Sequence, residues 1–118
     1  MIKLLSLSLI LLCVVGCTTQ STRYKWGNYS DGLYHYYQEP AEHSKIRARL
    51  VTHIENLEKQ EAVVPPGLYA EVGTYFLEAG DSTSAVIYYQ KEYEAWPESR
   101  DFMSALITNL QGRTNSGP

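Results

Sequence analysis

The chain has few cysteines and no concentration of positive charge. Its 118 residues include two cysteines, and both, Cys13 and Cys17, lie near the start. Beyond Cys17 there is no thiol, which excludes a disulfide framework, a cysteine nucleophile and a cysteine-based zinc site there. Ten Lys and Arg against 13 Asp and Glu give a net charge of −3, whereas a nucleic-acid-binding surface needs clustered cations. We therefore expect no nucleic-acid partner.

Motifs for catalysis and metal binding are also scarce. The three histidines, His35, His43 and His53, lack the i, i+3 or i, i+4 spacing that places two ligands on one helix face. No Gly-x-Ser-x-Gly motif and no phosphate-binding glycine loop occurs. Asp31 and Glu39 are the carboxylates nearest to a cluster of aromatic residues, but no motif positions them as a glycosidase pair. The sequence predicts a protein that is not an enzyme and has no cofactor or metal.

Long apolar runs are absent except at the start. Leu4–Val15 consists of apolar residues and serines and follows the cation Lys3. A membrane span needs about 20 residues, so this run is too short to cross a bilayer and has the length of a signal-peptide core. It ends in Val14-Val15-Gly16-Cys17, which resembles the lipobox of bacterial lipoproteins, and polar residues follow at once.

The lipobox resemblance implies how the chain is processed and where it is located. Residues 1–16 would be a signal peptide cleaved between Gly16 and Cys17, and Cys17 would carry a diacylglyceryl thioether and an acylated amine. Thr18 stands where Asp would imply retention in the inner membrane, so the resemblance implies the outer membrane, facing the periplasm. Residues 17–25 would be the lipidated cysteine and a polar tether. The alternative is an ordinary secretory signal with an incidental cysteine.

The remaining pattern predicts one all-α domain over residues 26–111. Ile46, Leu50, Ile54 and Leu57 form one apolar stripe at helical spacing. Gly80 suits the left-handed position after a helix, and Asp81 or Ser82 can cap the next one. We expect a disordered tail over residues 112–118. Helices are predicted over Leu33–Gln38, Ala41–Glu61, Leu68–Ala79 and Thr83–Trp96, and from Glu98 or Ser99 through Leu110.

The segment Pro66–Ser99 is 34 residues long and resembles a tetratricopeptide repeat. Its matching positions are Tyr69, Val72, Gly73, Phe76, Gly80, Ala85, Tyr89 and Pro97. Glu92 stands where the repeat usually has Ala, which suggests a looser or solvent-facing contact. The last helix resembles the first helix of a following repeat, with Phe102, Met103, Leu106 and Leu110 expected on its buried side. The fold class is thus predicted as a tetratricopeptide-like helical hairpin with flanking helices.

Two surfaces are candidates for binding a protein partner. If the repeat forms a groove, Ala70, Thr74 and Leu77 would line it, and Ser104 and Thr108 would continue it. The aromatic segment offers Trp26, Tyr29, Tyr34 and Tyr37, which could fill the core or form interface hot spots. Tyr34, Tyr36 and Tyr37 cannot all face inward, so at least one should be exposed. Because helical repeats bury their faces against neighbours, either the preceding helices or another subunit, including a second copy, must close the core.

A wider resemblance covers nearly the whole mature chain. Its residues are Trp26-Gly27-x-Tyr29, Leu33-Tyr34-x-Tyr36-Tyr37, Pro65-Pro66-Gly67-Leu68-Tyr69-Ala70-Glu71 and Trp96-Pro97-Glu98-Ser99-x-x-Phe102-Met103. They resemble a family of small bacterial lipoproteins described as domain of unknown function 4810. The resemblance implies an adaptor subunit of an outer-membrane lipoprotein assembly, with a curli-secretion-channel-like lipoprotein as a partner. The alternative is a peptidoglycan- or glycan-binding accessory, or an envelope enzyme, that uses Trp26, Tyr29 and Asp31.

Overall fold

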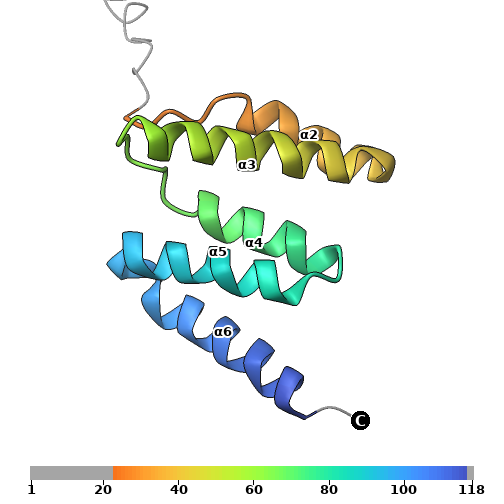
Figure 1. Cartoon of the computed structure of the whole chain (residues 1–118). Helices are drawn as coiled ribbons and strands as arrows, with labels where there is room; N and C mark the ends of the chain where they lie inside the picture. Colours follow the sequence, from red (N-terminus) through yellow and green to blue (C-terminus); the bar gives the residue numbers. More distant parts are fainter. Residues whose placement is uncertain (1–22, 117–118) are drawn as a thin grey trace, which may run out of the picture.

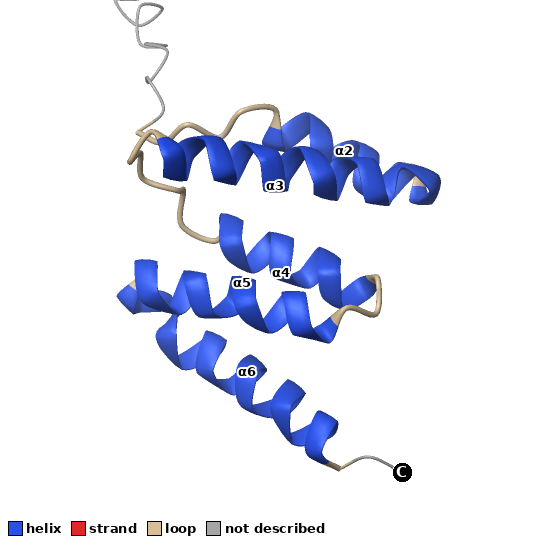
Figure 2. Cartoon of the chain, in the orientation of Figure 1, coloured by secondary structure: helices blue, strands red, loops and turns tan. Residues whose placement is uncertain are grey.

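The computed structural model describes residues 23–116, and every regular element in this range is helical. The all-α class and the helical hairpin with flanking helices are therefore confirmed (Figure 1 and Figure 2). Gly16, Cys17 and the predicted signal peptide lie outside the described residues. The elements in chain order are α2 (Tyr29–Gln38), the 3-10 turn η2 (Pro40–Glu42), α3 (His43–Lys59), α4 (Leu68–Glu78), α5 (Ser82–Ala95), the 3-10 turn η3 (Pro97–Ser99) and α6 (Arg100–Asn115).

Helices that follow one another in the chain pack against one another, so the domain is a stack (Figure 1). The predicted stripe of α3 is buried along its whole length and faces α4. Around it lie Tyr36 from α2, and Leu68, Val72 and Tyr75 from α4. The helices that precede the hairpin thus cover its core on this side. Of the two alternatives, the preceding helices or another subunit, the first applies here.

The α4–α5 hairpin is held by a close approach and a well-formed turn. A Cβ on Gly73 would lie 2.8 Å from two carbons of the Tyr89 ring, so only glycine fits where the helices cross. Gly80 has a φ of +82°, as expected for a residue that ends a helix in the left-handed region. Asp81 caps α5, since its side chain accepts a hydrogen bond from the Ser84 amide at 3.0 Å.

A second, smaller core lies between α5 and α6. It consists of Ala85, Tyr89, Met103 and Leu110, all buried. Phe76 of α4 packs against both cores and stacks on Tyr88 at 5.4 Å. The two cores are therefore continuous through the hairpin.

Two predicted boundaries are wrong. Helix α2 begins at Tyr29 rather than Leu33, because it lies against α3 and α4. A Cβ on Gly32 would lie 3.7 Å from the Ile46 side chain, and Tyr36 stacks on His43 and Tyr75 with centroid distances of 3.8 and 3.9 Å. At the other end, α6 runs to Asn115 through the tail predicted to be disordered from residue 112. These last residues are exposed, and the Thr114 hydroxyl donates a hydrogen bond to the Leu110 carbonyl oxygen at 3.0 Å within the helix.

The prediction that Glu92 faces solvent is also wrong. Its side chain is fully buried at the corner where α5 meets the start of α4 and the η3 turn. The Glu92 Oε1 atom accepts hydrogen bonds from the Gly67 amide at 2.8 Å and from the Ser99 hydroxyl at 3.0 Å. A polar residue is favoured here because its oxygen accepts hydrogen bonds from donors in two other segments. The sequence pattern of α5 alone does not contain this information.

Candidate functional site

An apolar groove of about 370 Å³ lies between α4 and α6. Ala70, Thr74 and Leu77, the three groove residues predicted on α4, line it. Its floor includes buried Tyr89, whose hydroxyl lies 3.0 Å from the Thr74 hydroxyl. The structure therefore brings the predicted residues of the first groove helix together on one surface.

The contribution of α6 to this groove differs from the prediction. Phe102, Met103 and Leu106 line it, whereas Ser104 and Thr108 are exposed and are not part of its lining. Residues two apart on a helix point in different directions, so the face that turns Phe102 and Leu106 toward α4 turns Ser104 away. Phe102 is not buried as predicted but 66% exposed, which leaves an aromatic ring at the edge of the groove.

Tyrosines of α2 lie near Glu71, a residue that lines the groove. Tyr36 is buried, whereas Tyr34 and Tyr37 are 65% and 69% exposed, as the packing argument requires. Tyr29 is half-buried, and its pKa is raised by burial and then by the Glu71 carboxylate and Tyr37. Glu71 also lines the α4–α6 groove. Tyr37 and the groove thus both lie near Glu71, and we call them together the groove face; Tyr34 contacts the His35 ring instead.

A second cleft, of about 510 Å³, lies between the aromatic segment and α3. Trp26 and Asp31 line it, together with Arg49 and His53. The His53 Nε2 atom lies 2.8 Å from the Lys25 carbonyl oxygen, so its N–H donates to the aromatic segment and fixes that segment on α3. Tyr29 does not line this cleft, although its ring lies 5.4 Å from that of Trp26.

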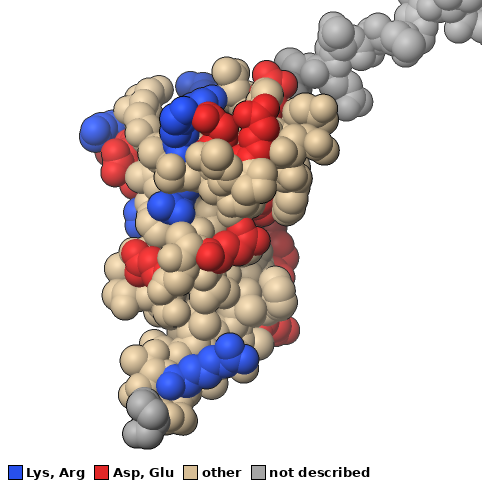
Figure 3. All heavy atoms as spheres, turned by 90° about the vertical axis from the view of Figure 1, so that its right-hand side faces the viewer, with Lys and Arg blue, Asp and Glu red and all other residues tan. Residues whose placement is uncertain are grey.

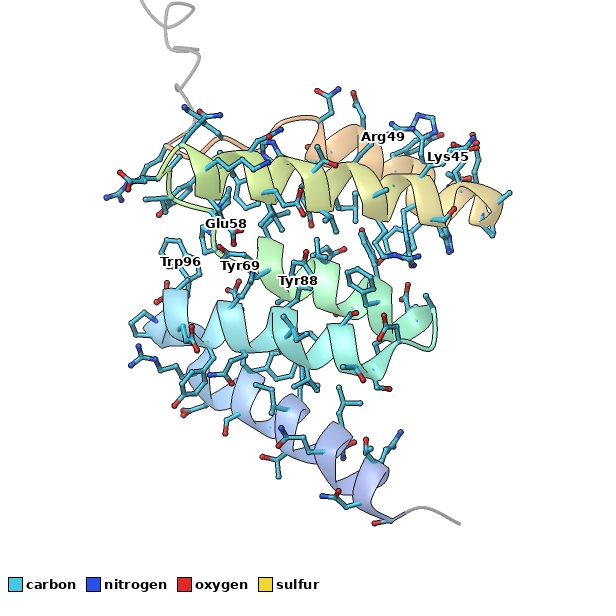
Figure 4. The ribbon with its side chains drawn as sticks, in the orientation of Figure 1. Lys45, Arg49, Glu58, Tyr69, Tyr88 and Trp96 are labelled. Carbon is cyan, nitrogen blue, oxygen red and sulfur yellow. The ribbon has the colours of Figure 1, made fainter. Side chains whose placement is uncertain are left out.

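Polar side chains between α3, α4 and α5 form a structural cluster. Glu58 Oε1 accepts hydrogen bonds from Lys91 Nζ at 2.9 Å and from the Tyr69 hydroxyl at 2.8 Å (Figure 4). Lys91 also lies over the Tyr69 and Tyr88 rings. Partial burial opposes ionisation of Glu58, but these two hydrogen bonds outweigh it and lower the pKa of the carboxyl. These two hydrogen bonds join α3, α4 and α5, so we assign the cluster a structural role.

Charge is mixed on one face of the domain, and residues 23–116 hold no cluster of metal ligands. Acidic and basic side chains are interspersed on the face shown in Figure 3, without a continuous stripe of either sign. No group of three or more His, Cys, Asp or Glu side chains in this range is placed to hold a metal ion. Among the described helices, none has the length and apolar character needed to cross a membrane.

The fold and the groove face define a small all-α domain that stacks helices and leaves an apolar groove on its surface. Residues 23–106 match the family described as domain of unknown function (DUF4810), and the chain belongs to this family. No curated protein and no solved structure has significant similarity to the chain. The matched range contains the groove, the aromatic segment and the Glu92 corner.

Proposed function

We propose that this protein is a lipid-anchored, non-enzymatic adaptor that binds other envelope proteins through the groove face. The observation that carries the proposal is the apolar groove with Phe102 exposed at its edge and with Glu71, which lies near the exposed Tyr37, in its lining. Aromatic side chains beside a desolvated pocket are typical of interface hot spots. The lipobox ending at Cys17 supports an anchor in the outer membrane, facing the periplasm.

The anchor is tested apart from the groove. With a clickable palmitate analogue, the wild-type chain should become labelled and be cleaved before Cys17, whereas Cys17→Ser should remain unlabelled and unprocessed by signal peptidase II. Two or more acyl chains are needed for stable attachment, so the variant should also leave the membrane fraction or remain as precursor. Normal maturation and membrane retention of Cys17→Ser would refute the anchor.

The groove is tested with two matched surface changes. Phe102→Glu and Ile87→Glu each place a charge at an exposed apolar residue, 66% and 52% exposed, but Ile87 lies on α5 outside the groove. Loss of a hot-spot contact costs about 2 kcal/mol or more, a roughly 30-fold weaker complex. Phe102→Glu should therefore lose partners that co-purify from detergent-solubilised membranes, and Ile87→Glu should keep them. The curli-secretion-channel-like lipoprotein implied by the family resemblance is the first partner to test.

The cleft beside α3 supports a second candidate function, binding of peptidoglycan or another glycan. It places the Trp26 ring near Asp31 and Arg49, and these groups suit the apolar face and the hydroxyls of a sugar. Sedimentation with purified peptidoglycan tests this candidate. Binding that is lost in Trp26→Ala and Asp31→Asn but kept in Phe102→Glu would favour the glycan-binding function over the adaptor.

A further inference from the structure

The edge of the domain where the described chain begins combines aromatic side chains with unpaired cations. The Tyr24 ring lies edge-on to Trp26 and Trp96, with centroid distances of 6.4 and 5.8 Å. An open groove of about 460 Å³ runs beside it, lined by Arg23, Tyr24, Lys25, Ala62, Val63 and Trp96. Val63 is 62% exposed, so an apolar side chain projects from the loop between α3 and α4. We call these residues the anchor-proximal edge.

The residues that line this edge include two cations and no carboxylate. Arg23 and Lys25 are exposed, and no described acidic side chain lies within ion-pair distance of them. The nearby Glu58 carboxylate is already paired with Lys91. Glu61 is the exposed acidic side chain of the adjoining loop. The edge therefore presents two available cations, with Glu61 in the adjoining loop.

This composition is that of a protein surface at a membrane–water interface. Trp and Tyr place an apolar ring and a polar tip at the headgroup level, and Lys and Arg contact anionic headgroups. The position in the chain agrees, because only five residues, 18–22, separate the proposed lipidated cysteine from Arg23. The six residue-to-residue steps from Cys17 to Arg23 span at most about 20–22 Å when fully extended, so an anchored domain keeps this edge close to the bilayer.

We propose that the anchor-proximal edge docks on the phospholipid headgroups of the membrane that holds the lipid anchor. The inference rests on the proposed anchor at Cys17 and adds a second contact, made by the folded domain itself. Docking fixes the orientation of the stack, with the start of the described chain on the bilayer and the C-terminal end of α6 directed away from it (Figure 1). An adaptor held in this way presents its groove face in a defined direction rather than on a freely rotating tether.

The two tryptophans of the chain, Trp26 and Trp96, both lie beside Tyr24, so intrinsic fluorescence reports on this edge. The mature lipidated protein is reconstituted into phosphatidylethanolamine–phosphatidylglycerol vesicles whose acyl chains are brominated near the headgroup or near the bilayer centre. Docking predicts that shallow bromines quench tryptophan emission more than deep bromines do. Emission unaffected by either lipid, in protein that floats with the vesicles, would overturn the proposal.

Charge reversal gives the matched comparison. Arg23→Glu combined with Lys25→Glu should reduce the shallow quenching by more than half, because each cation near an anionic surface contributes roughly a fivefold factor in affinity. Lys45→Glu combined with Arg113→Glu makes the same change in net charge at positions that line neither the Trp26 cleft nor the anchor-proximal edge, and should leave quenching unchanged (Figure 4 labels Lys45 and Trp96). Equal quenching in both double variants would contradict the proposal. Failure of the anchor itself is recognised separately, since that protein would not float with vesicles.

Discussion

Replacement of Glu92 tests whether the buried corner of the hairpin depends on hydrogen bonding. In Glu92→Ala the Gly67 amide and the Ser99 hydroxyl lose the oxygen that accepts from both. An unpaired buried donor costs about 1–3 kcal/mol, and the lost methylene burial adds about 0.8 kcal/mol. Gly67 is exposed and Ser99 half-buried, so water partly replaces the carboxyl and the lower figure applies. We expect the free energy of unfolding to fall by about 3 kcal/mol.

The assay is thermal and urea denaturation of Glu92→Ala beside Glu92→Gln. A loss of about 3 kcal/mol lowers the melting temperature of a domain this size by roughly 12–24 °C. Glutamine keeps an acceptor oxygen at the same position, so Glu92→Gln should remain within about 1 kcal/mol of wild type. Alanine is the usual residue here in a tetratricopeptide repeat. An Ala variant as stable as wild type would therefore refute the hydrogen-bonding explanation and favour simple packing.

Three further substitutions test the packing and the electrostatics. Gly73→Val should lower the free energy of unfolding in urea by about 2 kcal/mol, because its Cβ alone meets the Tyr89 ring, and an unchanged midpoint would contradict this. Glu58→Gln should reduce, but not abolish, the acid sensitivity of melting curves from pH 3 to 7. A carboxyl whose pKa is lowered on folding stabilises the protein above its ordinary value of 4.5, and this contribution disappears as pH falls. The pKa values of Glu42 and Asp81 are lowered too, so their contributions remain. A variant that keeps the wild-type slope would exclude Glu58 as its source. Tyr36→Phe removes the hydrogen bond to Glu78 but keeps the ring stacking, so the free energy of unfolding in urea should fall by about 1 kcal/mol. Tyr36→Ala removes both contacts and should lower it by about 3–5 kcal/mol. Equal losses in the two variants would show that stacking contributes little.

Helix periodicity and local end signals were enough to predict most of the fold. The stripe from Ile46 to Leu57 is buried as predicted, and Gly80 and Asp81 form the turn and cap that their residue types favour. These features depend on residues within one or two helical turns of one another. The sequence pattern contains that information because each signal and its structural partner are close in the chain.

The errors arise where the deciding contact is distant in sequence. Glu92 pairs with residues 25 positions before it and seven after it, so its polar character resembled a surface position. Phe102 has the spacing of a core residue, and the arrangement of α6 against α4 alone makes it the rim of a groove. Likewise, α2 extends past Gly32 because α3 and α4 support it. Periodicity identifies an apolar face but not what covers it.

Site-specific photocrosslinking in intact cells tests the central proposal, an adaptor that binds through the groove face, most directly. A photoreactive phenylalanine analogue is placed at Phe102, at the rim of the groove, or at Ile87, an exposed apolar position outside it. The proposal predicts a discrete adduct with an envelope protein from position 102, lost when Leu77→Glu disrupts the groove, and no such adduct from position 87. The same adducts from both positions, or none from position 102 in protein with a normal Cys17 anchor, would contradict it.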